Sequence, residues 1–112
     1  MLFRSLAGVW KHAEEPGWIE IQFEDDRGRG TVLRNDLFPE REGRLLLRNL
    51  AADASKPNLW RGEIYVERFE EFKKAELKLD GGARMTIEVK VGFISRSLDW
   101  VRVDSVPDAA GN

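Results

Sequence analysis

The stretch RMTIEVKV, at residues 84–91, decides the fold of this chain, because apolar and polar side chains alternate along its whole length. An alternation of period two is typical of a β-strand with one buried face and one solvated face. The preceding stretch AELKL, at residues 75–79, alternates in the same way, and the link Asp80-Gly81-Gly82 is a strong hairpin signal. These residues therefore predict two adjacent antiparallel strands.

The same pattern extends in both directions along the chain. Alternation at residues 18–24 is followed by turn residues at 25–30 and a return strand at 31–33, and residues 60–67 alternate again. A first strand is expected at 7–11, a last one at 98–103, and a flap-like loop at 35–43. Seven or eight short strands without long helices predict either a β-sandwich or a closed barrel.

Two segments are ambiguous at this level. Residues 66–74 contain no Gly or Pro and place Val66, Phe69 and Phe72 three residues apart, a spacing that is compatible with a short helix. We interpret this segment as a strand end, a loop with at most one helical turn, and a new strand. The segment 45–50 is also compatible with either helix or strand.

Length and composition exclude several classes of protein. A chain of 112 residues forms one domain, for which we predict a barrel at residues 1–106 and a disordered tail at residues 107–112. The absence of Cys excludes disulfides, thiol nucleophiles and thiolate metal sites, and a single His excludes a His-pair metal site within one chain. A net charge of −2 does not supply the basic field of a general nucleic-acid binder. The longest apolar runs are too short for a membrane-spanning helix, and no cofactor is expected.

Residues near both ends of the chain favour a barrel over a sandwich. Gly8-Val9-Trp10 opens the first predicted strand and Arg102 lies on the last. This arrangement resembles the closure signature of calycin barrels, a group that includes lipocalins, fatty-acid-binding proteins and avidins. The resemblance implies that Trp10 packs across one end of the barrel beneath the Arg102 guanidinium, a contact worth roughly 0.5–2 kcal/mol. The expected fold is all-β: an antiparallel up-and-down calycin-like barrel of about eight short strands, with at most one short helical turn.

A narrower resemblance covers about residues 6–103. The segments WRGEIY at 60–65, AELKLDG at 75–81 and RSLDWVRV at 96–103 fall in the order and at the spacing of the bacterial family called domain of unknown function 2147. The resemblance implies a small β-rich protein of a usually exported family without an established activity. The chain departs from the family pattern at Val66-Glu67, where an Asp-Pro pair is usual.

Candidate ligand-binding residues are large aromatic side chains. Four of them lie in predicted links between strands, where a barrel opens, and two lie on strands, where large aromatics also serve as core filler. The candidates are Phe38, Phe69, Phe72 and Phe93 in the links and Trp60 and Trp100 on the strands. The expected roles of Gly8, Trp10 and Arg102 are structural, in barrel closure.

Other candidates have a simpler structural explanation. His12 beside Glu14 and Glu15 is compatible with an acid–base pair, but a solvated loop after the first strand is favoured. A run of arginines is compatible with an anionic ligand, although acidic residues intersperse it; its members are Arg27, Arg29, Arg34, Arg41 and Arg44. No catalytic or metal-binding residue is predicted.

The sequence thus predicts a small non-enzymatic β-barrel that binds a small apolar or amphipathic ligand, since an eight-stranded barrel is just wide enough to hold one. The alternative is a protein–protein interaction module that uses an exposed aromatic surface or a strand edge near Trp18 or the 35–43 loop. No signal-peptide pattern follows Met1, so a cytoplasmic location is expected, or a periplasmic one if a leader has been removed.

Overall fold

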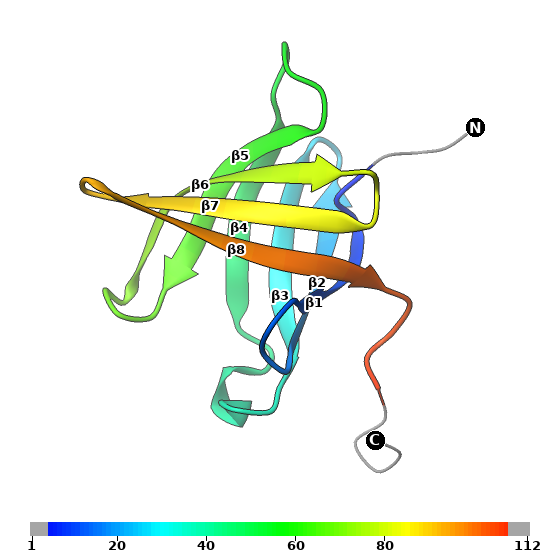
Figure 1. Cartoon of the computed structure of the whole chain (residues 1–112), viewed down its shortest axis with the longest axis vertical. Coiled ribbons are helices and arrows are strands. Elements are labelled where there is room, and N and C mark those ends of the chain that lie inside the picture. The colour runs from blue at the N-terminus through cyan, green and yellow to red at the C-terminus, as the bar shows by residue number, and fades with distance from the viewer. Residues whose placement is uncertain (1–4, 108–112) are drawn as a thin grey trace.

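The structure, a computed structural model, describes residues 5–107 and consists of eight β-strands and one short 3₁₀ helix (Figure 1). In chain order the elements are β1 (Gly8–His12), β2 (Gly17–Glu24), β3 (Arg27–Asn35), η1 (Pro39–Arg41), β4 (Leu45–Ala52), β5 (Leu59–Val66), β6 (Glu71–Asp80), β7 (Arg84–Val91) and β8 (Ile94–Val103).

The strands form a closed up-and-down barrel. Each strand pairs antiparallel with the next one, and β8 returns to pair antiparallel with β1, with Trp10 opposite Arg102 and His12 opposite Trp100. The predicted fold class is therefore confirmed: an all-β antiparallel barrel of eight strands, with one isolated helical turn at η1.

The links between strands lie alternately at two ends of the barrel. The open end carries the links at residues 13–16, 36–44, 67–70 and 92–93, which are at the left and bottom of Figure 1. The closed end carries the links at residues 25–26, 53–58 and 81–83, together with residues 5–7 that lead into β1. The closed-end links lie at the top and right of the same view.

Most predicted strands form at or near their predicted bounds. β7 spans the predicted residues 84–91, and the ambiguous segment 66–74 contains the end of β5, a turn, and the start of β6. The segment 45–50 is strand. β8 begins at Ile94 rather than residue 98, because a turn of only two residues, Gly92-Phe93, lets pairing resume at once. β3 begins at Arg27 rather than residue 31 for the same reason, after the turn Asp25-Asp26.

The predicted tail at 107–112 lies largely outside the described residues, which end at Pro107. The carbonyl oxygen of Pro107 accepts a hydrogen bond of 2.7 Å from Arg34 Nη1. The link at 36–44 matches the flap-like loop expected at 35–43, and the single helical turn of η1 lies within it.

Candidate functional site

Trp10 closes one end of the barrel. Its side chain is fully buried, and its indole Nε1 donates a hydrogen bond of 2.9 Å to the carbonyl of Leu6, which is also fully buried. The guanidinium carbon of Arg102 lies 4.4 Å from the centre of the Trp10 ring, so that a planar cation stacks on the indole face. This is the contact that the calycin resemblance implies for Trp10 and Arg102.

Arg102 joins three chain segments at this end. Its Nη1 and Nη2 donate to the carbonyls of Ala7 and Ser5 at 2.7 and 2.6 Å, and its Nε donates to the carbonyl of Gly82 at 2.7 Å. Gly8 leaves room for the guanidinium: its φ of +136° disfavours other residues, and a Cβ there would lie 2.7 Å from Arg102 Nη1. The glycine of the Gly-x-Trp pattern is thus required by the arginine above it.

The barrel interior is filled by side chains from all eight strands. Large residues that are fully buried include Leu6, Trp10, Ile19, Ile21, Leu47, Leu50, Leu77, Met85 and Ile87. An eight-stranded barrel is narrow enough for such side chains to meet across it. Trp60, predicted as a possible ligand contact, belongs to this packed core, and so does Trp100.

Trp100 differs from the other core residues in one respect. The side chain is only 6% exposed, yet its indole N–H has no hydrogen-bond acceptor within residues 5–107. It lies two residues before Arg102 on β8, towards the open end. Its ring makes an edge contact with the His12 ring, with 5.0 Å between the ring centroids. A buried donor without an acceptor is costly, on the order of 1–3 kcal/mol.

His12 has a structural role at the end of β1. Its Nδ1 accepts hydrogen bonds of 3.1 Å from the backbone N–H groups of both Glu14 and Glu15. The proton of the neutral imidazole is therefore on Nε2. The Glu14 and Glu15 contacts to the ring come from their backbone, which agrees with the favoured loop interpretation.

The exposed large apolar side chains of residues 5–107 are concentrated at the open end. All of them lie in an open-end link or within three residues of one, and they are Leu33, Leu37, Phe38, Leu45, Phe69, Phe93 and Ile94. Phe93 is completely exposed at the tip of the β7–β8 hairpin, which extends beyond the rest of the barrel in Figure 1.

The structure thus brings three of the predicted aromatic residues, Phe38, Phe69 and Phe93, to the same end of the barrel. Phe72 lies elsewhere, on the outer face of β6, where it packs edge-on against Tyr65 and beneath the Arg48 guanidinium. The alternation along β6 explains this position, because Ala75, Leu77 and Leu79 face inward and residue 72 has the opposite parity.

Exposed leucines and Ile94 are the open-end residues that the sequence analysis missed. Leu37 lies next to Phe38, and Ile94 directly follows Phe93, so proximity to a predicted link residue was the available signal. Trp18, in contrast, is not exposed: Lys11 and Arg34 cover its ring, at 5.6 and 5.2 Å from the ring centre.

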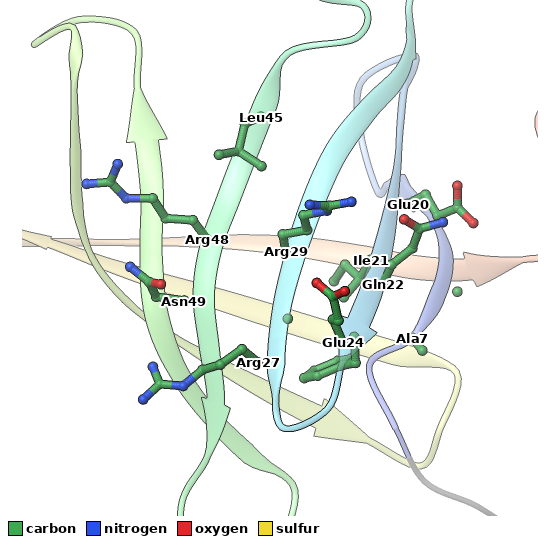
Figure 2. A pocket seen from close by; sticks show the side chains of 13 residues that line it. Ala7, Glu20, Ile21, Gln22, Glu24, Arg27, Arg29, Leu45, Arg48 and Asn49 are labelled. Carbon is green, nitrogen blue, oxygen red and sulfur yellow. The ribbon is translucent and has the colours of Figure 1, made fainter.

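A second feature is an open groove of about 820 Å³ on the outer face of the barrel (Figure 2). Glu20 and Glu24 of β2 project along one side of it, and Arg27 and Arg48 project along the other. The groove therefore carries both signs of charge and no single-sign field that would select an anion or a cation.

The predicted arginine run is divided between two places. Arg27 and Arg29 line this groove, whereas the other three lie near the open end and pair with acids. Arg34 binds Asp36 at 2.6 Å, and Arg41 and Arg44 lie 3.8 and 3.3 Å from Glu67. Their charges are offset locally, which argues against a shared anion site for the whole run.

Hydrogen bonds to two carboxylates lower their pKa values. A hydrogen bond from Arg48 Nε, at 2.6 Å, lowers the pKa of Glu63 from its ordinary value. The backbone N–H groups of Ser55 and Lys56 hold the pKa of Asp53 well below its usual range. Both shifts favour the ionised carboxylate, for Glu63 on β5 and for Asp53 in the link between β4 and β5.

Within residues 5–107 the only helix is the three-residue η1, so no helix there is long and apolar enough to cross a bilayer. The described residues also contain no group of three or more His, Asp or Glu side chains placed to hold a metal ion.

Comparison with known proteins gives one informative match. No family model and no curated protein sequence matches the chain. A solved structure of protein HP1028 from Helicobacter pylori, described as belonging to the lipocalin family, superposes with a TM-score of 0.67. It shares 12% sequence identity, and the alignment covers 92% of this chain and 86% of the other. Identity at that level shows the fold alone: the chain has a lipocalin-like, and hence calycin-like, barrel.

Proposed function

We propose that this protein binds a small amphipathic ligand at the open end of its barrel, without catalysing a reaction. The observation that carries the proposal is the concentration of exposed apolar side chains at that end, with none of comparable size exposed elsewhere in residues 5–107. A lipocalin-like fold is compatible with this function.

The packed interior limits how deep the ligand lies. Leu47, Met85 and Ile87 are fully buried, so a ligand that keeps the core intact sits at the mouth, between the open-end links. The apolar part would contact Phe38 and Phe69, which project from two different links. Burial of such apolar side chains favours binding by roughly 25 cal/mol of free energy for each Å² of apolar surface removed from water.

The polar part of the ligand has a candidate anchor in Trp100. An indole N–H that is buried without an acceptor gains a hydrogen bond only when an oxygen atom reaches it. A carbonyl or carboxylate group on an otherwise apolar molecule supplies that oxygen. The proposed ligand class is therefore an apolar molecule with one acceptor group.

The absence of catalysis is part of the proposal. The imidazole of His12 is the candidate general base in the sequence, and its Nδ1 already accepts hydrogen bonds from two backbone N–H groups. This supports a structural role for the ring.

Binding of the amphipathic dye 1-anilinonaphthalene-8-sulfonate tests the proposal. We expect saturable binding of one dye molecule per chain, with Phe69→Ala raising the Kd about threefold to tenfold. Trp100→Phe, which keeps the aromatic volume but removes the N–H, is expected to raise the Kd about fivefold.

Val9→Ala is the matched control, because Val9 lies on the outer face of β1 near the closed end and its loss leaves the Kd unchanged. The proposal is wrong if the dye does not saturate, or if all three variants bind it equally. Native mass spectrometry of the purified protein provides a second readout, since a retained ligand adds a discrete mass.

One finer assignment belongs to the same proposal: membership in the bacterial family called domain of unknown function 2147, which rests on the sequence segments quoted above. A second candidate function, protein–protein interaction through exposed aromatics, is favoured by the complete exposure of Phe93 at a hairpin tip. The strand edge predicted near Trp18 is absent, because β2 pairs with β1 on one side and with β3 on the other.

A further inference from the structure

The barrel is closed along only part of β8. Strand β1 has five residues and pairs with β8 at residues 100–103, which are four of the ten residues of β8. Beyond this ladder the backbone N–H of Ala13 donates to the carbonyl of Asp99 at 2.9 Å. Residues 94–98 pair with β7 on one side and with no described strand on the other.

The geometry of the ladder identifies which backbone groups are free. In an antiparallel strand, successive residues direct their N–H and C=O groups to opposite neighbours. The carbonyl of Asp99 points to the β1 side, because it binds Ala13. Ser95 and Ser97 have the same parity as Asp99, so their N–H and C=O groups also point away from β7 and lie on the open edge.

This edge is accessible from solvent. Residues 94–97 are exposed, and Ile94 is 65% exposed directly after the fully exposed Phe93. The segment lies on the hairpin that extends beyond the barrel in Figure 1. An exposed edge of this kind is a template for pairing with another strand, and proteins that do not use such an edge usually shorten or cover it.

We propose that residues 94–98 of β8 receive an extended acidic segment of a partner protein, which pairs antiparallel with β8 and continues the line of β1. This role differs from ligand binding at the mouth because it uses the free backbone groups of one strand, and of the exposed apolar open-end side chains it shares only Ile94.

Charge on the edge selects an acidic partner. Arg96 stands in the centre of the free segment, is exposed, and forms no ion pair within residues 5–107. Since it is flanked by Ser95 and Ser97, an added strand would face Arg96 in a non-hydrogen-bonded pair, where opposite side chains approach most closely. A carboxylate at that position of the partner is favoured, and a lysine is disfavoured.

The neighbours of Arg96 define the rest of the partner. Ile94 and Leu98 lie on the same face of β8 as Arg96, two residues away in each direction. Apolar residues two positions before and after the carboxylate would contact them. The expected partner segment therefore alternates, with an apolar residue, an acidic residue and a second apolar residue at every other position.

A second copy of this chain fits the edge less well. In the two-fold antiparallel register that uses the whole free segment, Arg96 stands directly opposite Arg96 of the other copy. Like charges in a directly opposed pair destabilise a sheet.

A synthetic peptide, TVTETVT, and its lysine counterpart, TVTKTVT, test the proposal by fluorescence anisotropy with the full chain. We expect the acidic peptide to bind and the lysine peptide to bind at least threefold more weakly. Arg96→Glu is expected to reverse that preference, a result that a merely apolar contact at Phe93 does not produce.

Backbone pairing is tested independently of charge. Ser97→Pro removes an N–H from the open edge and none from the β7 ladder, and is expected to weaken peptide binding at least tenfold. Ser97→Thr keeps the N–H and serves as the matched control. A peptide N-methylated at alternate positions probes the same hydrogen bonds without altering the protein, which keeps the test decisive if Ser97→Pro does not fold.

Three outcomes overturn the proposal. The first is equal binding of both peptides to the wild type, and the second is full binding of the N-methylated peptide. The third is a dimer of the free chain that Ser97→Pro dissociates, because a second copy would then occupy the edge. The N-methylated peptide leaves the protein, and with it dye binding at the mouth, unchanged, so failure of one proposal is distinguishable from failure of the other.

Discussion

The two ends of the barrel contain similar chemical groups but use them differently. At the closed end an arginine lies on an aromatic ring, and its three nitrogen atoms each donate to a backbone carbonyl. At the open end Arg41 also lies on an aromatic ring, 3.9 Å from the centre of Phe38, but Phe38 is exposed and Arg41 is half-buried. Within residues 5–107 the Arg41 side chain pairs further only with Glu67, at 3.8 Å.

The difference between the ends separates stability from binding. Hydrogen bonds to buried or partly buried backbone groups contribute to stability, whereas solvated ion pairs and exposed rings contribute little. An open end that adds little to stability is free to carry exposed apolar side chains for a ligand. Paired substitutions at the two ends test this comparison.

The largest expected difference is between Trp10 and Phe93. Trp10→Ala removes a fully buried side chain and is expected to lower the free energy of unfolding by about 3–5 kcal/mol. Phe93→Ala removes a fully exposed ring and should change it by less than about 0.5 kcal/mol. Urea denaturation measures both, and similar losses would show that the closed end does not dominate stability.

The two arginine–aromatic contacts provide the second comparison. Arg102→Leu leaves the carbonyls of Ser5, Ala7 and Gly82 without their donors and is expected to cost about 2–3 kcal/mol. Arg41→Leu breaks an exposed contact and should cost less than about 1 kcal/mol. A large loss for Arg41→Leu in thermal unfolding would contradict the assignment of stability to one end.

Two glycines with positive φ extend the comparison to the backbone. Gly8→Ala places a Cβ 2.7 Å from Arg102 Nη1 and is expected to cost about 2 kcal/mol, from backbone strain together with displacement of the guanidinium. Gly43→Ala, in the open-end link, meets nothing within 4 Å, so only the backbone strain of about 1 kcal/mol remains. Equal losses would mean that the Arg102 contact adjusts without cost.

The smallest effect is expected from Asp53, in a solvated link of the closed end. Its pKa is lowered first by the Ser55 backbone N–H and also by Lys56, the Ser55 hydroxyl and Arg61. Because the folded state favours the carboxylate, Asp53 stabilises the fold above its unfolded pKa of about 4, and this contribution is lost as the pH falls below that value.

Asp53→Asn should therefore lower the Tm slightly at pH 7, and the difference from wild type should narrow progressively below pH 4. Thermal unfolding followed by circular dichroism at pH 7 and pH 2.5 measures this difference. A gap that widens in acid would show that the carboxylate is not the stabilising form.

The local sequence pattern was sufficient to predict most of the strands and the links between them. The alternation at 84–91 defined β7 to the residue, because side chains that point to opposite faces must differ in polarity when one face is buried. Turn residues located the links, and through them Phe38, Phe69 and Phe93 at the open end. The same reasoning placed Phe72 in a link, whereas pairing of β6 with β5 extends to Glu71 and turns Phe72 to the outer face.

The sequence by itself determined that this chain forms short antiparallel strands, since the period of its hydrophobic residues is a local property of the backbone. Closure of these strands into a barrel was indicated only by the resemblance at Gly8, Trp10 and Arg102. Tertiary structure decided which end is sealed and which is exposed, how far β1 covers β8, and that the indole N–H of Trp100 is buried without an acceptor. Those features depend on which residues meet across the closed sheet. The lengths of the strands, and the register between strands that are far apart in the sequence, decide which residues meet.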